Sequence, residues 1–335
     1  MSSKEKDIIE IGEGWACALL TEKKVPAVHC YHNKKLISKL PIESMIPCNP
    51  ANHIPIKEKI PKLNGAFSLA QVPEPKSLKK VALHLNNRLR KAALPSNALV
   101  VKIEGDAPSL VISVGGSSRH TYDNPELIDM LATTEASQNM TCTGASPLAF
   151  FKLPANGNPC QPTLGLVGLL HREIPNIGLS FRKKGDMIYL VGFSVEDIAS
   201  SEYLYSFHRI HPSPAPWVNP KEQSRLQSML TEAIRRNLLS SIHSVTKGGL
   251  FTSLLESSLQ NQLGFDITTD AEIREDAFLF GESFGRFIVS TSEQNDAPFV
   301  DMMTQNKIPV TTLGHTTKGE IRVDDISFGY IHDFA

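Results

Sequence analysis

The sequence predicts an α+β or α/β protein with two domains. Strand-like and helix-like segments alternate through the second half of the chain, which is typical of a two-layer domain where helices pack on a sheet. Its 335 residues are enough for about two domains. With 41% hydrophobic and 21% charged residues, the composition is that of a soluble globular protein and excludes a disordered or collagen-like chain.

The first 76 residues combine short strands with a proline-rich connector. Apolar segments separated by turns predict strands at 15–20, 29–31 and 35–37. Six prolines follow between residues 46 and 76, and at that density they exclude regular helix and central strand. We therefore interpret residues 46–76 as an extended connector.

Residues 77–172 are interpreted as the first of the two domains. Leu78, Val81, Leu85 and Leu89 recur at helical spacing after Ser77 and predict a helix. The remaining elements expected in this domain are strands at 98–103 and 110–114, a helix from 125 to about 140, and strands at 148–153 and 164–170.

Residues 173–335 are interpreted as the second domain. Pro220 begins an amphipathic pattern that predicts a helix to about Ile234, and Gly248-Gly249 opens another that ends near Gly264. The other expected elements are strands at 187–191, 287–290, 310–313 and 320–323, and a helix at 297–305.

Charge and cysteine content limit the classes of partner. The net charge of -1 argues against bulk attraction to nucleic acid or an anionic membrane, and no apolar stretch reaches the length of a membrane span. Five scattered cysteines without a C-x-x-C pair argue against a disulfide scaffold or a structural zinc site. Reduced thiols in a cytoplasmic protein, with no bound metal, are the expectation.

The segment H-S-V-T-K-G-G-L, from His243 to Leu250, is a candidate phosphate-binding site. Gly248 and Gly249 would let backbone N–H groups approach a phosphate at a helix N-terminus, and Lys247 or a charged His243 would assist. The alternative is a glycine loop that packs tightly on a strand, next to a surface histidine.

Three further segments carry candidate binding residues. In G-E-S-F-G-R, Glu282, Ser283 and Arg286 would contact metal, hydroxyl or phosphate, or Glu282 and Arg286 would simply form a local ion pair. Ser201 and Glu202 would place a hydroxyl and a carboxylate at a site, unless the serine only caps a helix. Secondary anion-binding candidates follow a glycine-serine loop: Arg119 and Tyr122.

Taken in order, these segments resemble the C-terminal half of phosphoribosylformylglycinamidine synthase, in the superfamily of aminoimidazole ribonucleotide synthetase. The family motifs P-T-P-x-I-G-x-V-G-L, G-G-S-E-Y-L, H-D-x-S-x-G-G-L and F-S-E-S-x-G-R-F have counterparts here. Further similar segments extend the resemblance over nearly the whole chain. The matching residues are 31–41, 100–105, 139–148, 162–169, 179–192, 199–204, 243–250 and 280–287.

The resemblance implies a two-domain synthetase-like architecture, with a truncated N-terminal barrel-forming domain and an α/β C-terminal domain. It also implies ATP-dependent amination of formylglycinamide ribonucleotide, with Mg²⁺ and ATP as cofactors. Ser244, Lys247 and the A-S-S-E-Y-L segment depart from the motifs, and the two former replace acidic residues. Losing carboxylates weakens coordination of Mg²⁺, which prefers oxygen ligands.

Two hypotheses follow from the motifs and their departures. The chain is either an enzyme or enzyme subunit of this family, degenerate and not catalytic alone, or a non-catalytic nucleotide-binding, phosphate-binding or assembly protein on the same scaffold. Because a single barrel half would leave an open sheet edge, which proteins normally cover, we expect a homodimer.

Overall fold

The structure is a computed structural model, and it describes most but not all of the chain. Five short strands between residues 9 and 47 are described by their backbone. The other described ranges are 69–89, 97–102, 108–116, 125–153, 163–175, 177–210, 213–216 and 218–334. These residues form two compact units: 1–57, 92–140 and 145–172 in the first, and 58–91, 141–144 and 173–335 in the second.

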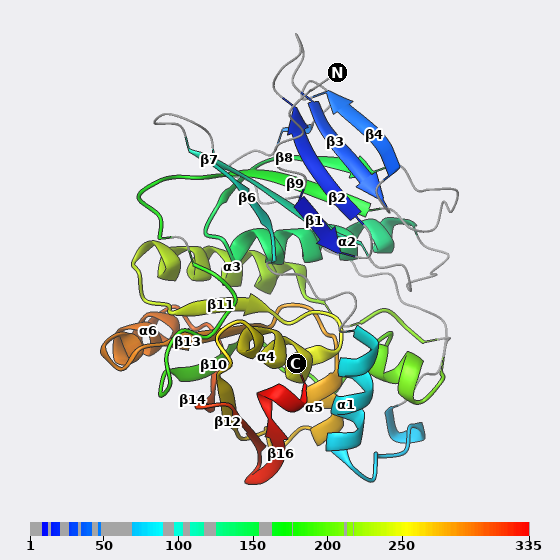
Figure 1. Cartoon of the computed structure of the whole chain (residues 1–335), viewed down its shortest axis with the longest axis vertical. Coiled ribbons are helices and arrows are strands. Elements are labelled where there is room, and N and C mark those ends of the chain that lie inside the picture. The colour runs from blue at the N-terminus through cyan, green and yellow to red at the C-terminus, as the bar shows by residue number, and fades with distance from the viewer. Residues whose placement is uncertain are drawn as a thin grey trace. The chain divides into compact units, whose positions relative to one another are not determined.

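The first unit contains two antiparallel sheets (Figure 1). One has the order β1-β2-β3-β4, built from Ile9–Gly12, Trp15–Leu20, Ala27–His32 and Lys35–Pro41. The other has the order β5-β8-β9-β7-β6, built from Ile46–Pro47, Ser146–Leu153, Thr163–Leu170, Ser109–Gly115 and Leu99–Val101. The strands expected in this part are confirmed, β1 and β5 were not predicted, and β8 begins two residues before its predicted start.

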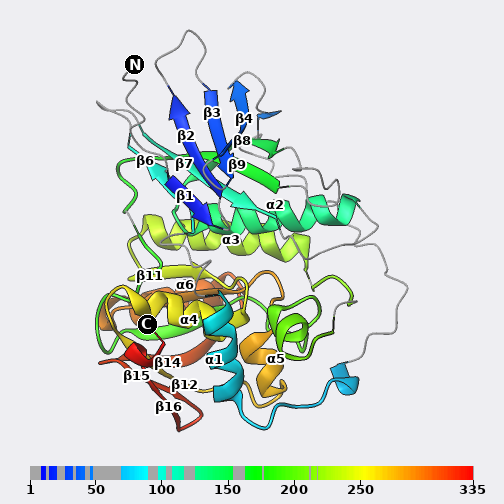
Figure 2. The same cartoon turned by 45° about the vertical axis from the view of Figure 1, so that its right-hand side comes forward.

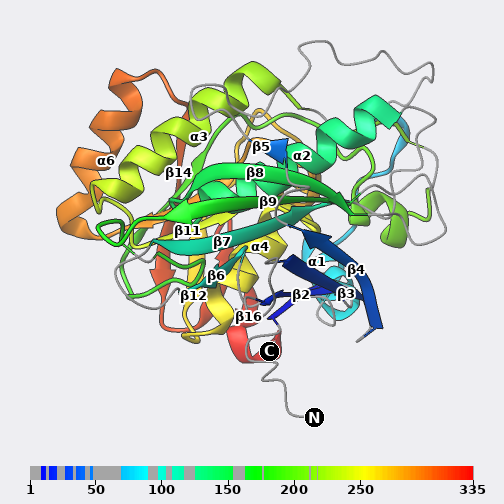
Figure 3. The same cartoon turned by 90° about the horizontal axis from the view of Figure 1, so that it is seen from above.

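Helix α2, Pro125–Thr141, packs closely on the five-stranded sheet (Figure 3). The hydroxyl of Ser113 on β7 donates to the carbonyl oxygen of Ala136, 2.7 Å away. A Cβ on Gly115 would lie 2.0 Å from the carbonyl oxygen of Ala132, so only glycine fits there. The small residue at the end of β7 therefore lets the helix backbone approach the strand.

The second unit is built on a seven-stranded sheet with the order β11-β13-β10-β14-β12-β15-β16. All neighbouring strands are antiparallel except β12 and β15, which are parallel. The strands are Met187–Val191 (β10), Ser241–Ser244 (β11), Gly264–Ile267 (β12), Phe287–Thr291 (β13), Val310–Thr317 (β14), Glu320–Val323 (β15) and Ile326–Tyr330 (β16).

Helices cover both faces of this sheet. The helices are Leu78–Leu89 (α1), Pro220–Arg235 (α3), Gly249–Leu259 (α4), Glu275–Phe280 (α5) and Glu293–Gln305 (α6). Helices α1, α4 and α5 lie together (Figures 1 and 2), and their apolar side chains share one core with Ile188 and Leu190 of β10.

Between those two core residues, Tyr189 contacts α6 on the opposite face, with its ring centroid 5.6 Å from that of Phe299. The hydroxyl of Tyr189 also donates to Asp296 of α6 at 2.7 Å. The predicted α/β class is confirmed, and the second unit has three layers where two were expected, because β10 presents apolar side chains to both faces.

Most of the wrong secondary-structure predictions in the second unit concern short helices and strands that contain polar residues. The predicted helix from Gly249 to near Gly264 ends at Leu259, and Gly264 instead begins β12. A Cβ on Gly264 would lie 2.0 Å from the carbonyl oxygen of Glu320, so this glycine permits close strand pairing and does not end a helix. The elements β11, α5 and β16 were also not predicted.

Helix α1 belongs to the second unit, whereas the sequence placed residues 77–172 together in the first domain. Val81 and Leu85 on its apolar face are fully buried in the core of the second unit. In the part of the chain that the structure describes, no helix has the length and apolar character needed to cross a membrane.

Candidate functional site

Most of the predicted site residues gather near one edge of the seven-stranded sheet. Strands β10 and β11 end at this edge, and the antiparallel strands β13 and β14 begin there. Phe287, the first residue of β13, pairs with the last residues of β10 and β11, which are Val191 and Ser244. The loop after β11 carries Lys247, Gly248 and Gly249, and the loop before β13 carries Glu282, Ser283 and Arg286. Antiparallel pairing thus unites motifs that are far apart in the sequence.

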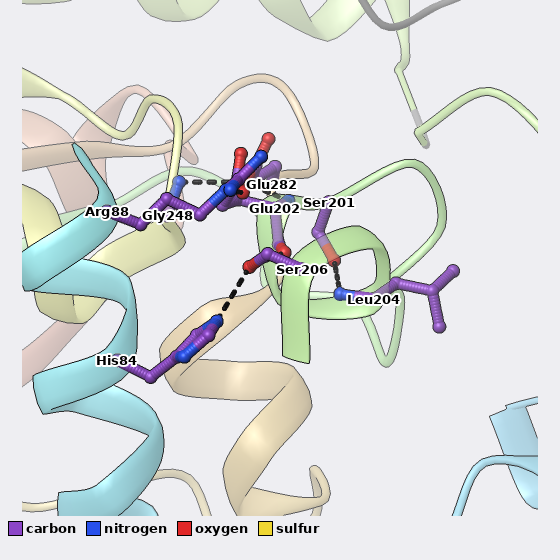
Figure 4. A network of polar contacts seen from close by, with 8 residues as sticks. All are labelled: His84, Arg88, Ser201, Glu202, Leu204, Ser206, Gly248 and Glu282. Atoms are coloured by element: carbon purple, nitrogen blue, oxygen red, sulfur yellow. Dashed lines mark hydrogen bonds and ion pairs between the residues drawn. The ribbon is translucent and has the colours of Figure 1, made fainter. Parts of the chain in front are cut away.

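Glu282 joins two of the predicted segments through its carboxylate (Figure 4). Its Oε1 accepts hydrogen bonds from the backbone N–H groups of Glu202 and Gly248, each at 2.7 Å. Such charge-assisted bonds to backbone amides are strong. The carboxylate therefore fixes the segment that contains Glu202 against the start of α4.

Glu202 is fully buried and forms an ion pair with Arg88 of α1, drawn in Figure 4. The Arg88 guanidinium also lies 5.8 Å from the centre of the Tyr205 ring, within the range of a cation–π contact. A second contact from α1 joins His84 Nε2 to the hydroxyl of Ser206 at 3.2 Å. Helix α1 thus holds the one-turn π-helix Tyr203–Phe207 in place.

Ser201 acts within its own segment as a cap. Its Oγ accepts from the backbone N–H of Leu204 at 3.1 Å and donates to the carbonyl oxygen of Ile198 at 2.6 Å. The geometry matches the alternative in which this serine caps a helical turn.

In the glycine loop, residues 244–249, most backbone amides donate to acceptors inside the second unit. Gly248 donates to Glu282, as described above, and three more amides have internal partners. They are Val245 N to Arg286 O at 2.8 Å, Thr246 N to Ser253 Oγ at 3.2 Å, and Gly249 N to Thr246 O at 3.0 Å. A phosphate would have to compete with these acceptors, so the geometry favours the tightly packed loop.

The two glycines of this loop are required by backbone conformation and by space. Gly248 and Gly249 have φ angles of 84° and 75°, in the left-handed region that favours glycine. A Cβ on Gly249 would lie 2.7 Å from the carbonyl oxygens of Leu279 and Gly281. Lys247, immediately before them, is half-buried.

His243 is a buried residue of β11, whereas the alternative to phosphate binding placed this histidine on the surface. It is 3% exposed, and its Nε2 lies 2.7 Å from Glu256 Oε2 of α4. This contact ties the strand to the helix that covers it.

Arg286 is fully buried beneath the loop and donates to backbone carbonyls. Its guanidinium contacts the oxygens of Phe278 at 3.2 Å and Gly281 at 2.5 Å. Burial lowers the pKa of Arg286 to about 10, although the nearby carboxylates of Asp197 and Glu282 act in the opposite direction. The side chain therefore stays charged at neutral pH and serves as an internal clamp.

The other candidates have different surroundings. The segment from Glu282 to Arg286 is not helical, so their four-residue spacing does not create the helix-type ion pair considered above. Ser283 is 1% exposed, and its Oγ has no hydrogen-bond partner among the described residues. Arg119 and Tyr122 lie outside the described residues.

Two carboxylates of the candidate site contact internal partners. Within the described ranges, no group of three or more His, Cys, Asp or Glu side chains could hold a metal ion. Glu282 and Glu202 each use Oε1 for an internal partner. Mg²⁺ usually binds through one or two carboxylates together with waters and substrate phosphates, so a bound nucleotide would have to supply most of the ligands at such a site.

Sequence reasoning missed the partners that position these carboxylates. Arg88 lies 114 residues before Glu202 in the chain, and its helical pattern indicates only a solvated face of α1. Glu256 was likewise indistinguishable from any polar residue of α4. No local pattern could have paired them.

Comparison with known proteins identifies the class that this fold and loop arrangement define. Residues 183–326 match the family model described as AIR synthase related protein, C-terminal domain. The second unit therefore carries an AIR synthase-related C-terminal domain.

Over a larger part of its length the chain is similar to PurL. The chain is 26% identical over 262 residues to the phosphoribosylformylglycinamidine synthase subunit PurL of Moorella thermoacetica. This match covers 65% of the chain and 36% of the relative. The structure of T. maritima PurL complexed with FGAR is similar with a TM-score of 0.62 and 13% identity, over 78% of this chain and 54% of that one. T. maritima PurL complexed with ATP gives a TM-score of 0.57 at 12% identity, covering 71% of this chain and 46% of that one. The chain thus matches only about a third to a half of these relatives.

Proposed function

We propose that this chain is a PurL-like protein that does not aminate formylglycinamide ribonucleotide alone and acts as an assembly partner on the synthetase scaffold. One observation carries the proposal. The amides of the glycine loop and the Oε1 atoms of Glu202 and Glu282 are hydrogen-bonded or ion-paired inside the second unit. A phosphate that approached these loop amides would have to break their bonds, and each broken buried bond costs about 1–3 kcal/mol.

The sequence departures support the same function. Ser244 and Lys247 stand where the resembled motif carries acidic residues, and Ser244 is fully buried on β11. A lysine beside the two glycines attracts an anion but repels a divalent cation. Coordination of Mg²⁺-ATP, which catalysis by the family requires, is therefore weakened at its centre.

An amination assay combined with calorimetry tests this function. The full chain is mixed with Mg²⁺-ATP, formylglycinamide ribonucleotide and an ammonium salt, and product is measured alongside heats of binding for ATP, ADP and the ribonucleotide. We expect no product above the uncatalysed rate, and turnover by the purified chain would overturn the proposal. A heat of binding for ATP or ADP, measured without turnover, would instead indicate that the chain is a nucleotide-binding protein on the same scaffold.

The assembly role predicts a homodimer formed through the first unit. The described strand orders place β1 and β4 at the ends of one sheet, and β5 and β6 at the ends of the other. Terminal strands have unpaired backbone groups that a second copy can cover. Light scattering on the full chain at micromolar concentrations should give twice the 36.8 kDa chain mass, whereas a single monomeric species would contradict this role.

A further inference from the structure

The last turn of helix α1 packs against the glycine loop and against Glu202. A Cβ on Gly248 would lie 2.6 Å from the Cδ1 atom of Leu89, so this leucine fills the space beside the glycine. One residue earlier in the helix, Arg88 forms its ion pair with Glu202, as Figure 4 shows. The chain thus places two of its own side chains on the candidate site.

Two groups surround the Arg88 guanidinium and match its chemistry. The Glu202 carboxylate accepts from its Nε atom. The guanidinium carbon lies over the Tyr205 ring, 5.8 Å from the ring centre, where the face of an aromatic ring attracts a cation. A carboxylate suits the N–H groups of a guanidinium, and an aromatic face suits its planar surface. The same two groups would recognise a guanidinium that came from another molecule.

Arg88 is held less firmly than Arg286, which lies beneath the same loop. Arg286 is 1% exposed and donates to two backbone carbonyls, so it cannot leave without opening the loop. The Arg88 side chain is 45% exposed and extends from the end of a helix, where local opening costs least. The Arg88 guanidinium can therefore exchange between the carboxylate and water.

The rest of α1 is anchored independently of this ion pair. Val81 and Leu85 are fully buried in the core of the second unit. The carboxamide of Asn86 donates to the carbonyl oxygen of Phe334 at 3.0 Å and ties the helix to the end of the chain. Removal of the Arg88 side chain should therefore leave the helix in place and open a space beside the carboxylate.

Glu202 still attracts a cation when Arg88 is absent. Its side chain is fully buried, and burial of a carboxylate is costly unless a positive charge or hydrogen-bond donors accompany it. The carboxylate of Glu282, which accepts from the Glu202 amide at 2.7 Å, adds negative charge to the site. A cation with N–H donors is the class of ligand that this arrangement favours.

We propose that this is a guanidinium-binding site that the chain occupies with its own Arg88, which makes the last turn of α1 an autoinhibitory contact. A small ligand with an alkylguanidinium group takes the place of the Arg88 side chain, pairs with Glu202 and lies on the Tyr205 ring. The site goes beyond the function proposed above, because it concerns a cation and exists whether or not the chain dimerises or catalyses amination.

Chemical rescue tests the proposal on the full chain. Arg88→Ala removes the counter-ion of Glu202 and should lower the melting temperature by about 5 °C. Ethylguanidinium at about 20 mM should restore about half of this loss, as expected for a Kd of a few millimolar. Tetramethylammonium has the same charge but no N–H donor, and at the same concentration it should restore none.

Two controls separate binding at this site from general effects. In the wild type, Arg88 already fills the site, so ethylguanidinium should leave the melting temperature unchanged. Arg236→Ala breaks an exposed ion pair with Glu232 on helix α3 and should likewise show no response to either cation. Equal rescue by both cations would show charge screening only, and an equal response of Arg236→Ala would show a general effect; either result would overturn the proposal.

Further variants keep the test decisive if Arg88→Ala does not fold. Arg88→Gln keeps an N–H donor for the carboxylate, so it should fold, and ethylguanidinium should still raise its melting temperature. Glu202→Gln, added to either Arg88 variant, should abolish the rescue because a neutral carboxamide no longer attracts the cation. Absence of rescue in both Arg88 variants, or rescue that persists after Glu202→Gln, would contradict the assigned site.

Discussion

The glycine loop at 244–249 and the start of α3 at Gln223 lie at the same edge of the seven-stranded sheet, but they differ in how their polar groups are used. Around the glycine loop, the amides of Gly248 and Glu202 share the Glu282 carboxylate. At the start of α3, Gln223 Oε1 is buried without a partner among the described residues. The backbone amides of the loop with the more suggestive sequence have internal acceptors, whereas the side-chain oxygen at the inconspicuous helix start has no partner among the described residues.

This difference shows what glycine and carboxylate motifs mean in a scaffold. Packing explains glycines that have positive φ angles and little space around them. A buried carboxylate that accepts hydrogen bonds from backbone amides is explained by the two loops that it holds together. Neither requires a ligand. An unpaired buried acceptor has no such internal explanation, and an ordered water is one partner that would satisfy it.

The largest effect should come from breaking the clamp beneath the glycine loop. Arg286→Met leaves the carbonyls of Phe278 and Gly281 without their donor and removes a buried charge that faces Asp197 and Glu282. We expect the free energy of unfolding to fall by about 4 kcal/mol in urea denaturation. Arg236→Met, at a side chain 61% exposed, is the control and should cost less than about 1 kcal/mol. Similar losses in both variants would refute the clamp.

A second variant separates packing from phosphate binding at the glycine loop. Gly249→Ala forces a side chain into a left-handed conformation and places Cβ 2.6 Å from the backbone carbon of Phe280. The expected loss is about 3 kcal/mol, combining conformational strain with overpacking. Gly178→Ala has open space around its Cβ and should be nearly neutral. If Gly249→Ala unfolds like the wild type and loses only phosphate affinity, the loop is a binding loop after all.

The Glu282 carboxylate can be tested with a pair of substitutions. Glu282→Ala leaves the amides of Glu202 and Gly248 without an acceptor, and we expect a loss of about 2 kcal/mol in the free energy of unfolding. Glu282→Gln keeps an oxygen acceptor at the same position and should recover more than half of that loss. Equal destabilisation by both variants would mean that the negative charge, and not the two hydrogen bonds, is what matters.

Much of the fold was predictable because its signals are local. The apolar run of β10 and the proline start of α3 at Pro220 are visible in a window of a few residues. Strands β11 and β12, with four residues each and polar members such as His243 and Asp266, have no such signal. Their strand conformation comes from pairing with β13, β14 and β15, which a local pattern does not contain.

The sequence motifs single out several residues of the candidate site but not the contacts that those residues make. The motifs predict binding residues near Glu202, Gly248 and Glu282, and in the structure hydrogen bonds to Glu282 bring these three together. Their partner Arg88 and the unpaired oxygen of Gln223 arise from packing between distant elements. Residue type alone does not reveal whether a buried polar atom has a partner, because that depends on the completed fold.

The smallest predicted effect is a pH dependence in the segment that Glu282 holds. His208 ends the π-helix and contacts the Tyr203 ring at 4.7 Å, and burial lowers its pKa below the ordinary value of 6.5. Since the unfolded chain binds more protons than the folded one just below pH 6.5, this contribution to stability is complete above that pH and decreases as the pH falls. Replacing the ring, as in His208→Phe, should therefore flatten the decline in unfolding free energy between about pH 7 and 5. A steeper decline in His208→Phe than in the wild type would mean that the protonated ring is stabilised in the fold, with Asp276 outweighing burial.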